Sequence, residues 1–165
     1  MDDGVKSMLK VSFKNYDENL ENIYKFRYPL WHEVYKEIIP EKQIDFLLHK
    51  YFDVENIRTY IKDNYIYEKI ILDENVVGII CYKLFDNYVY LDKIYLLKSY
   101  RNLGISKFVY HHLLSFKNRI RLNVNQKNSA VNSYLRSGFK IIKEESYDLG
   151  QDMINIDYIM ELEKE

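Results

Sequence analysis

The chain has 165 residues, of which 47% are hydrophobic, and a formal net charge of −1, so we expect one globular domain and exclude a wholly disordered chain. No apolar run approaches the roughly 20 residues of a membrane-spanning helix, and no basic-then-apolar leader opens the chain, so we expect a cytoplasmic protein that makes no membrane contact. The one cysteine, Cys81, lies in an apolar run, where we expect a buried small residue rather than a nucleophile. The predicted domain is 1–165, with residues 1–8 as a tail.

The first third of the chain predicts one strand and then a set of helices. Alternating apolar residues predict the strand over residues 9–13. Apolar residues at helical spacing follow, with Asp and Pro at positions suited to helix starts. These helices begin at Asp17, Leu30, Pro40 and Val54, and the last ends near Lys62. In that last helix we expect Ile57, Tyr60 and Ile61 to face the core.

The middle of the chain predicts three strands joined by tight turns, over residues 65–72, 76–84 and 88–97. The turns are marked by polar residues at 73–75 and 86–87, which favour tight backbone reversals. The second strand is almost entirely apolar, which is typical of a central strand covered on both faces. Consecutive strands with such short connections predict an antiparallel meander.

After residue 97 the pattern alternates between helix and strand. The predicted elements are a helix over 104–117, a strand over 119–123, a helix over 128–137, and strands over 139–147 and 153–162. The apolar face of the first helix comprises Ile105, Phe108, Val109, Leu113 and Phe116. Gly138 is expected to cap the second helix in a left-handed conformation. The last strand alternates, so we expect one buried face, and a strand–helix–strand unit across 88–123 predicts a locally parallel pair.

Charge is distributed unevenly along the chain. Between Lys93 and Lys143 there are eleven Lys or Arg residues and no Asp or Glu, which leaves 13 basic and 25 acidic residues elsewhere. Such asymmetry indicates an anionic partner for the basic stretch, with a solvated basic face as the alternative.

The strand-to-helix connection over residues 98–107 suits a diphosphate. Amide N–H groups at a helix start lack intrahelical partners, and the helix dipole adds partial positive charge there. Gly104 permits a close backbone approach and Ser106 is small enough to leave room for an anion. The basic side chains that could balance the phosphate charge are Lys98, Arg101 and Lys107. An ordinary strand-to-helix connection is the alternative.

Three short motifs follow one another over residues 88–140. They are Leu91-x-x-Ile94-Tyr95-Leu96, then Arg101-x-x-Gly104-x-Ser106, and then Asn128 followed by Tyr134-x-x-x-Gly138-Phe139. Their order and spacing resemble the GNAT superfamily of N-acetyltransferases. Two departures are that Ser106 replaces the usual Gly or Ala, and Lys98 replaces a common Pro.

The resemblance implies an α/β (α+β) acyl-CoA N-acyltransferase fold with acetyl-CoA as co-substrate. Its sheet would be mixed, mostly antiparallel, with six to seven strands, a splayed parallel pair and four to five flanking helices. A β-bulge in the strand over 88–97 would produce the splay.

The resemblance also implies roles for individual residues. Backbone groups of Ile94 and Leu96 would bind the pantetheine arm, Asn128 would hydrogen-bond the CoA arm, and Tyr134 would protonate the leaving thiolate. The residues that would cradle the pyrophosphate are Arg101, Asn102, Leu103, Gly104, Ile105, Ser106 and Lys107. Taken alone, Tyr134 could equally be a core aromatic.

The early helices would supply the acceptor pocket in such a protein. Trp31 and Tyr35 beside Glu33 suit a cationic amine, and residues 31–44 resemble the bacterial polyamine-type branch of the superfamily. The alternative is that the two rings only pack on each other, four positions apart. Asp92 and Glu33 are candidates for the general base.

We therefore expect an N-acetyltransferase in which a primary amine, favoured to be a small cationic amine or polyamine, attacks acetyl-CoA directly in a ternary complex. We expect no metal, because no His or Cys pair has zinc spacing, no nucleic acid, and a monomer or homodimer. The alternatives are a non-catalytic CoA-binding sensor and a nucleic-acid-binding module that uses residues 93–143. The pI near 6.4 is low for the latter. The acceptor, the base, the oligomeric state and the use of other acyl groups stay open.

Overall fold

The computed structural model describes most of the chain, over residues 9–16, 28–29, 31–33, 35–37, 39–51, 54–148 and 150–165. The tail expected over 1–8 and the helix start expected at Asp17 lie outside these ranges. The chain divides into two compact units, which are described separately: Met1–Tyr82 with Lys93–Ile105, and Lys83–Asp92 with Ser106–Glu165. A single domain over 1–165 stays a prediction. None of the helices in the described ranges has the length and apolar content that a bilayer crossing requires.

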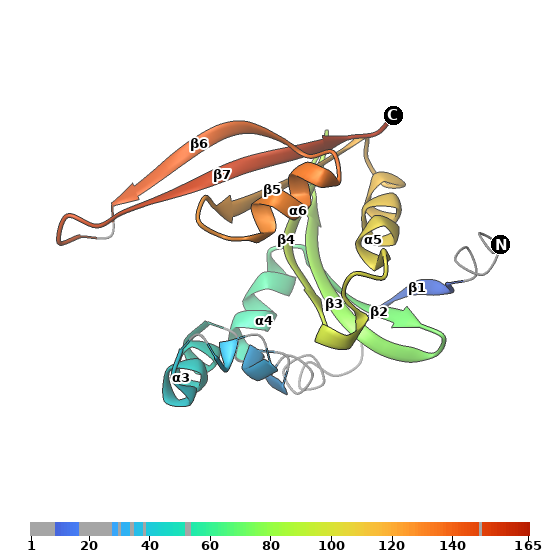
Figure 1. Ribbon diagram of the computed structural model, residues 1–165. Coiled ribbons are helices and arrows are strands. Elements are labelled where there is room, and N and C mark those ends of the chain that lie inside the picture. Colours follow the sequence, from blue (N-terminus) through green and yellow to red (C-terminus); the bar gives the residue numbers. More distant parts are fainter. Residues whose placement is uncertain are drawn as a thin grey trace. The chain divides into compact units, whose positions relative to one another are not determined.

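A mixed sheet of seven strands organises the described residues, in the order β1-β2-β3-β4-β5-β7-β6 (Figure 1). Its strands are β1 (Val11–Asn15), β2 (Tyr65–Leu72), β3 (Asn75–Leu84), β4 (Val89–Leu96), β5 (Arg119–Asn125), β6 (Lys140–Asp148) and β7 (Ile154–Glu163). The helices are α3 (Glu41–Tyr51), α4 (Val54–Lys62), the 3-10 helix η1 (Lys98–Tyr100), α5 (Ile105–Leu114) and α6 (Ala130–Arg136). The predicted α/β architecture, a mixed sheet with one parallel pair, is confirmed; the pair is β4 and β5.

In the first unit, a tight turn joins neighbouring strands as predicted. β1 pairs antiparallel with residues 68–72 of β2. The loop between β2 and β3 consists of Asp73 and Glu74, whose φ angles are 48° and 75°. A two-residue loop with both residues left-handed has a twist that matches the flanking strands. The connection is therefore a hairpin loop, which the polar turn sequence indicated.

The core of the first unit is centred on β3. This strand is buried over six consecutive residues, 77–82, as expected for a central strand. Cys81 is fully buried there and belongs to the same apolar cluster as Ile57 of α4, which confirms its predicted place. Ile61, which we expected to face inward, is 39% exposed. The reason is that α4 buries only the narrow stripe that carries Ile57 and Tyr60.

Buried tyrosines make the fold sensitive to alkali. Burial raises the pKa of Tyr16 from 10.0 to about 12, and burial is also the largest cause of the raised pKa of Tyr82 and of Tyr110. Because each folded pKa exceeds the unfolded one, the resulting stability is complete below about pH 10 and is lost as the pH rises through the folded pKa. We expect the urea midpoint to fall steeply between about pH 10 and 12, and less steeply in Tyr16→Phe. A midpoint that does not change over this range would contradict the prediction.

Helix α5 buries a single stripe of side chains. The stripe consists of Ile105, Val109 and Leu113, which lie four positions apart and are at most 1% exposed, and Tyr110 beside it is 6% exposed. Phe108 and Phe116, which we placed on the same face, are 37% and 42% exposed. Phe108 lies about 100° around the helix from its buried neighbour. Phe116 follows the end of the helix, which is reached at Leu114, three residues before the predicted end.

In the second unit, β5 lies between two partners of opposite direction. Its parallel ladder with β4 joins Val89 with Ile120 and Tyr90 with Arg121. Its antiparallel ladder with β7 extends along the whole of β5. The predicted parallel crossover is therefore confirmed, and the β4 ladder is much shorter than the β7 ladder.

β6 and β7 continue as a two-stranded ribbon beyond the end of β5 (Figure 1). The β5 ladder ends opposite Asp157, whereas β6 pairs with β7 up to Ile154. Ile154 is 68% exposed, although we expected one face of this strand to be buried along its length; Met160, further along, is fully buried. The reason is that only β6 and β7 are paired at this end, and a two-stranded ribbon covers little apolar surface.

Candidate functional site

A tight loop joins β4 to α5. β4 ends at Leu96, η1 follows, and the chain turns over residues 101–104. Asn102 and Gly104 are left-handed, with φ of 62° and 83°. The loop is exposed at these positions, whereas Ile105, which begins α5, is 1% exposed and anchors the turn. Because the first amide N–H groups of a helix lack intrahelical partners, this exposed turn is suited to an anion.

Contacts within the first unit hold this loop and the end of β4 in place. Nε of Arg101 donates a hydrogen bond to the carbonyl oxygen of Leu96, at 3.1 Å. A Cβ atom at Gly78 of β3 would lie 2.4 Å from the carbonyl oxygen of Tyr95. Glycine is therefore needed at position 78 for β4 to lie where it does. The fixed carbonyl lies between Ile94 and Leu96, the two positions predicted to meet pantetheine.

Glu33 reaches the start of this loop from the N-terminal helical segment. Its Oε1 accepts a hydrogen bond from the backbone N–H of Lys98, at 3.1 Å. The rings of Trp31 and Tyr35 have centroids 4.6 Å apart, so they do pack on each other, and burial raises the pKa of Tyr35. The structure thus brings the carboxylate of Glu33, a residue predicted to belong to the acceptor site, to the predicted phosphate loop. Asp92 is half-buried on β4 and belongs to the second unit.

Asp45 of α3 is a polar residue of this region that sequence reasoning missed. Its Oδ1 accepts a hydrogen bond from the Tyr28 phenol at 2.6 Å and lies 2.9 Å from Nε2 of His32. The bond from Tyr28 is the largest cause of the lowered pKa of Asp45, and His32 also lowers it. Because Asp45 is 13 residues from His32 and on another helix, no local pattern could have found the contact.

Asn128 lies two residues before α6, rather than inside the helix as predicted. Its Oδ1 accepts a hydrogen bond from the backbone N–H of Ala130, at 2.8 Å, and so satisfies a donor at the helix start. This bond uses one of the two lone pairs of the side-chain oxygen. A contact from Asn128 to a CoA arm would come from its Nδ2 donors or from the second lone pair of Oδ1.

The other end of α6 closes on Gly138. The N–H of Gly138 donates to the carbonyl of Leu135, and that of Phe139 to the carbonyl of Tyr134, at 3.1 and 3.0 Å. With Gly138 at φ 102°, these bonds form a Schellman motif, which confirms the predicted left-handed cap. Tyr134 is half-buried, and its ring centroid lies 5.4 Å from that of Phe139.

Ser106 has a partner one turn further along α5. Burial is the largest cause of the raised pKa of Tyr110, and the nearby Tyr134 phenol also raises it, while hydrogen bonds with Ser137 and Ser106 lower it. Ser106, which we expected among the residues that cradle the pyrophosphate, therefore also has a contact inside the protein. The spacing of four between Ser106 and Tyr110 is the local signal that could have indicated this contact.

The arginines of β5 pair with carboxylates of β7. Nε of Arg121 lies 2.6 Å from Oε2 of Glu161, and Nε of Arg119 lies 3.5 Å from Oε1 of Glu163. The bond to Glu161 is the largest cause of the raised pKa of Arg121. Two charges of the basic stretch are thus balanced within the second unit, which counts against nucleic-acid binding by these residues.

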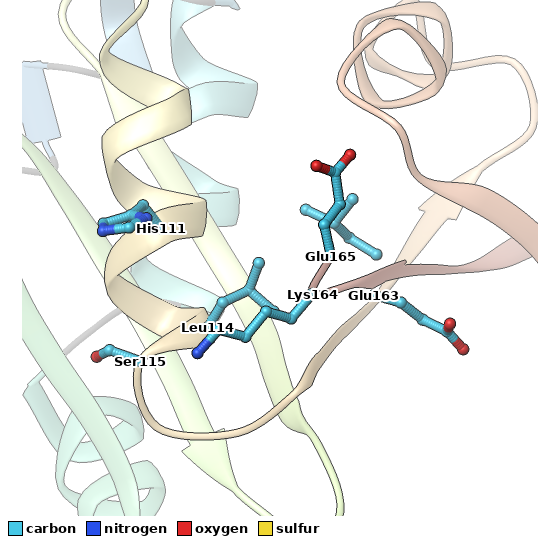
Figure 2. A pocket seen from close by; sticks show the side chains of 7 residues that line it. His111, Leu114, Ser115, Glu163, Lys164 and Glu165 are labelled. Atoms are coloured by element: carbon cyan, nitrogen blue, oxygen red, sulfur yellow. The ribbon is translucent and has the colours of Figure 1, made fainter.

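A pocket of about 500 Å³ opens between the ends of α5 and β7 (Figure 2). It is lined by His111, Leu114, Ser115, Leu162, Glu163, Lys164 and Glu165. It contains none of the predicted site residues and lies at the opposite end of α5 from the loop. In the described part of the chain, no group of three or more His, Cys, Asp or Glu residues could hold a metal ion. A metal-free site stays a prediction.

Comparison with known proteins gives one family. A family model described as an acetyltransferase (GNAT) domain matches residues 35–161. No curated protein matches the chain closely enough to count as a relative.

Several solved structures share the fold. PaiA N-acetyltransferase from Thermoplasma acidophilum, in complex with coenzyme A, is 22% identical over 93% of this chain and 99% of its own, with a TM-score of 0.70. Arabidopsis thaliana Naa50, in complex with the bisubstrate analogue CoA-Ac-MVNAL, is 19% identical over 92% and 97%, with a TM-score of 0.59. A GNAT-family acetyltransferase from Streptococcus pneumoniae is 16% identical over 94% and 100%, with a TM-score of 0.55.

Proposed function

The chain belongs to the GNAT family of acetyltransferases, since the family model matches most of it, and on this basis we propose that it transfers the acetyl group of acetyl-CoA to a primary amine. The protein is an acyl-CoA-dependent N-acyltransferase. We propose that the amine attacks the thioester directly, within a ternary complex, so that no covalent enzyme intermediate forms. The favoured acceptor is a small cationic amine or a polyamine.

The exposed loop before α5 is the observation that carries this proposal. The unpaired amide N–H groups and the dipole at the helix start favour a diphosphate. No atom outside residues 103–105 lies within 4 Å of a Cβ built at Gly104, so an anion can approach the backbone closely there. The bond from Arg101 to Leu96 uses one of five guanidinium N–H donors and keeps the positive charge beside the loop. The other residues that we assign to the diphosphate are Asn102, Leu103, Ile105, Ser106 and Lys107.

The backbone of β4 is the proposed site for the pantetheine arm. Its parallel ladder with β5 includes Tyr90, four residues before Ile94. We propose that Ile94 and Leu96 offer their backbone groups to pantetheine, as an added strand would. The predicted splay and β-bulge belong to this proposal, and the short ladder supports them.

Tyr134 is the proposed general acid. A neutral amine attacks the carbonyl carbon, the C–N bond forms and the C–S bond breaks. The CoA thiolate takes its proton from the Tyr134 phenol, which solvent then reprotonates. The backbone N–H of Leu96 would stabilise the developing negative charge on the carbonyl oxygen, and Nδ2 of Asn128 would hold the CoA arm. The proton of the attacking amine passes to Asp92 or Glu33, directly or through water, and from there to solvent.

The N-terminal helical segment is the proposed acceptor site. Trp31 and Tyr35 offer aromatic faces, and Glu33 offers a carboxylate next to the loop that we assign to CoA. A cation is attracted by both kinds of group. The acidic excess outside residues 93–143 acts in the same direction, because it favours the approach of cationic acceptors.

Acetyl-CoA should stabilise the protein, and amine acceptors should release its thiol. At a hundredfold excess over Kd the gain is ~2.7 kcal/mol, which for a chain of this size raises the melting temperature by roughly 5–10 °C. Free thiol is then measured with polyamines, amino acids, amino-containing antibiotics and peptides as acceptors.

These measurements, together with a test of retention on DNA, separate the competing functions. A non-catalytic sensor would show the thermal shift and release no thiol with any acceptor. A nucleic-acid-binding module would be retained on DNA in a salt-dependent manner that CoA does not affect. The absence of a thermal shift with millimolar acetyl-CoA would overturn the proposed function.

A further inference from the structure

Phe139 packs against two tyrosine rings in the second unit. Its ring centroid is 5.4 Å from that of Tyr134, with an angle of 62° between the planes, and 5.1 Å from that of Tyr110, with an angle of 73°. Both pairs are edge-to-face, one of the arrangements that aromatic rings prefer. Phe139 is 2% exposed and Tyr110 is 6% exposed, so this support is part of the core.

Phe139 also holds the backbone of Tyr134. Its N–H donates to the Tyr134 carbonyl oxygen at 3.0 Å, as part of the turn that closes α6. Tyr134 is therefore fixed twice by the same residue, at its carbonyl group and at its ring. A rotation of the Tyr134 ring would give up the edge-to-face contact.

We propose that Phe139 is a positioning residue, which together with the Tyr110 ring packed on it holds the Tyr134 phenol in the orientation that protonates the leaving thiolate. This inference rests on the proposed role of Tyr134. Its physical basis is that proton transfer requires the donor within hydrogen-bond reach of the acceptor, so an unsupported ring spends less time in the productive orientation.

Phe139→Leu keeps an apolar side chain but removes the ring, and should lower kcat about tenfold. The reason is that the edge-to-face contact shifts the equilibrium between the productive and other orientations of the Tyr134 ring by about that factor. The Kd of acetyl-CoA should not change. In a Tyr134→Phe background, Phe139→Leu should lower kcat no further, because the phenol it positions is absent. Independent, multiplying effects of the two substitutions would overturn the proposal, as would a wild-type kcat in Phe139→Leu.

Two comparisons separate positioning from a loss of stability. Leu113→Ala removes buried volume from α5 and should lower the melting temperature while kcat, measured well below that temperature, stays at the wild-type value. Tyr110→Phe keeps the supporting ring and should retain kcat, whereas Tyr110→Leu should lower it. Equal kcat values for the two Tyr110 variants would remove Tyr110 from the support.

The positioning role can also be tested without measuring enzyme activity. This test is needed if the wild type acetylates no amine, so that the proposed function itself fails. The ring-flip rate of Tyr134 can be followed by NMR with ring-labelled tyrosine, its signal being identified by its loss in Tyr134→Phe. We expect the rate to rise about tenfold in Phe139→Leu. An unchanged flip rate would overturn the positioning role, whatever the activity of the protein.

Discussion

Gly104→Asp is expected to weaken acetyl-CoA binding by at least about 100-fold, because like charges in contact cost several kcal/mol and 1.4 kcal/mol is a factor of ten. The substitution places a carboxylate where the α5 amides would meet the diphosphate. Beyond residues 103–105 no atom lies within 4 Å of the new Cβ position, so the side chain has room, and the cost that remains to the protein is the strain of a left-handed backbone. Calorimetric titration with acetyl-CoA measures the change.

Gly150→Asp is a matched control. Gly150 has the same φ of 83° and likewise no atom within 4 Å of its Cβ position, but it lies between β6 and β7. Both variants carry the same left-handed strain, so a loss of affinity confined to Gly104→Asp isolates the site. Gly104→Ala adds the strain and a methyl group without the charge, and should lose less affinity than Gly104→Asp. Wild-type affinity in Gly104→Asp would refute the loop assignment.

Tyr134→Phe should lower kcat about 100-fold, the lower end of what a positioned general acid contributes. The ring that packs on Phe139 is retained, so α6 and its closing turn should remain intact. The affinity for acetyl-CoA should stay nearly unchanged, because the phenol acts on the leaving group and not on the resting thioester. Steady-state kinetics and a direct titration give the two values.

Tyr147→Phe is the control for the loss of a phenol. Tyr147 lies on β6, is 40% exposed and donates a hydrogen bond to Oε2 of Glu145 at 2.6 Å. Its replacement should leave kcat at the wild-type value. If Tyr134→Phe also retained full turnover, Tyr134 would be a packing residue, the alternative that the sequence left open.

The sequence predicted the bounds of an element correctly where polar turn residues or a regular spacing of apolar residues marked its ends. The bounds of β2 and of α4 are those of the sequence prediction, since polar turn residues end one and the apolar stripe through Ile57 defines the other. The exposure of Phe108 and Ile154 could not be predicted in this way. An apolar side chain does not reveal whether a neighbouring layer covers it, and neither position is covered.

In the candidate site too, some features follow from a local sequence pattern and others do not. The left-handed conformations of Gly104 and of the cap at Gly138 could be predicted, because a left-handed residue at a helix terminus is a local requirement. The contact between Glu33 and Lys98 joins residues 65 positions apart, and that between Asp45 and His32 joins separate helices. Such contacts depend on how the elements pack, which spacing along the chain does not encode.

The bond from Arg101 to the Leu96 carbonyl has a consequence for ligand capture. A segment that must order itself around a guest loses conformational entropy in doing so, and the affinity falls accordingly. Here the protein's own hydrogen bond and the buried Ile105 already define the curvature of the turn. For the diphosphate that we propose binds here, less conformational entropy then remains to be lost on binding, because contacts within the protein already shape the turn.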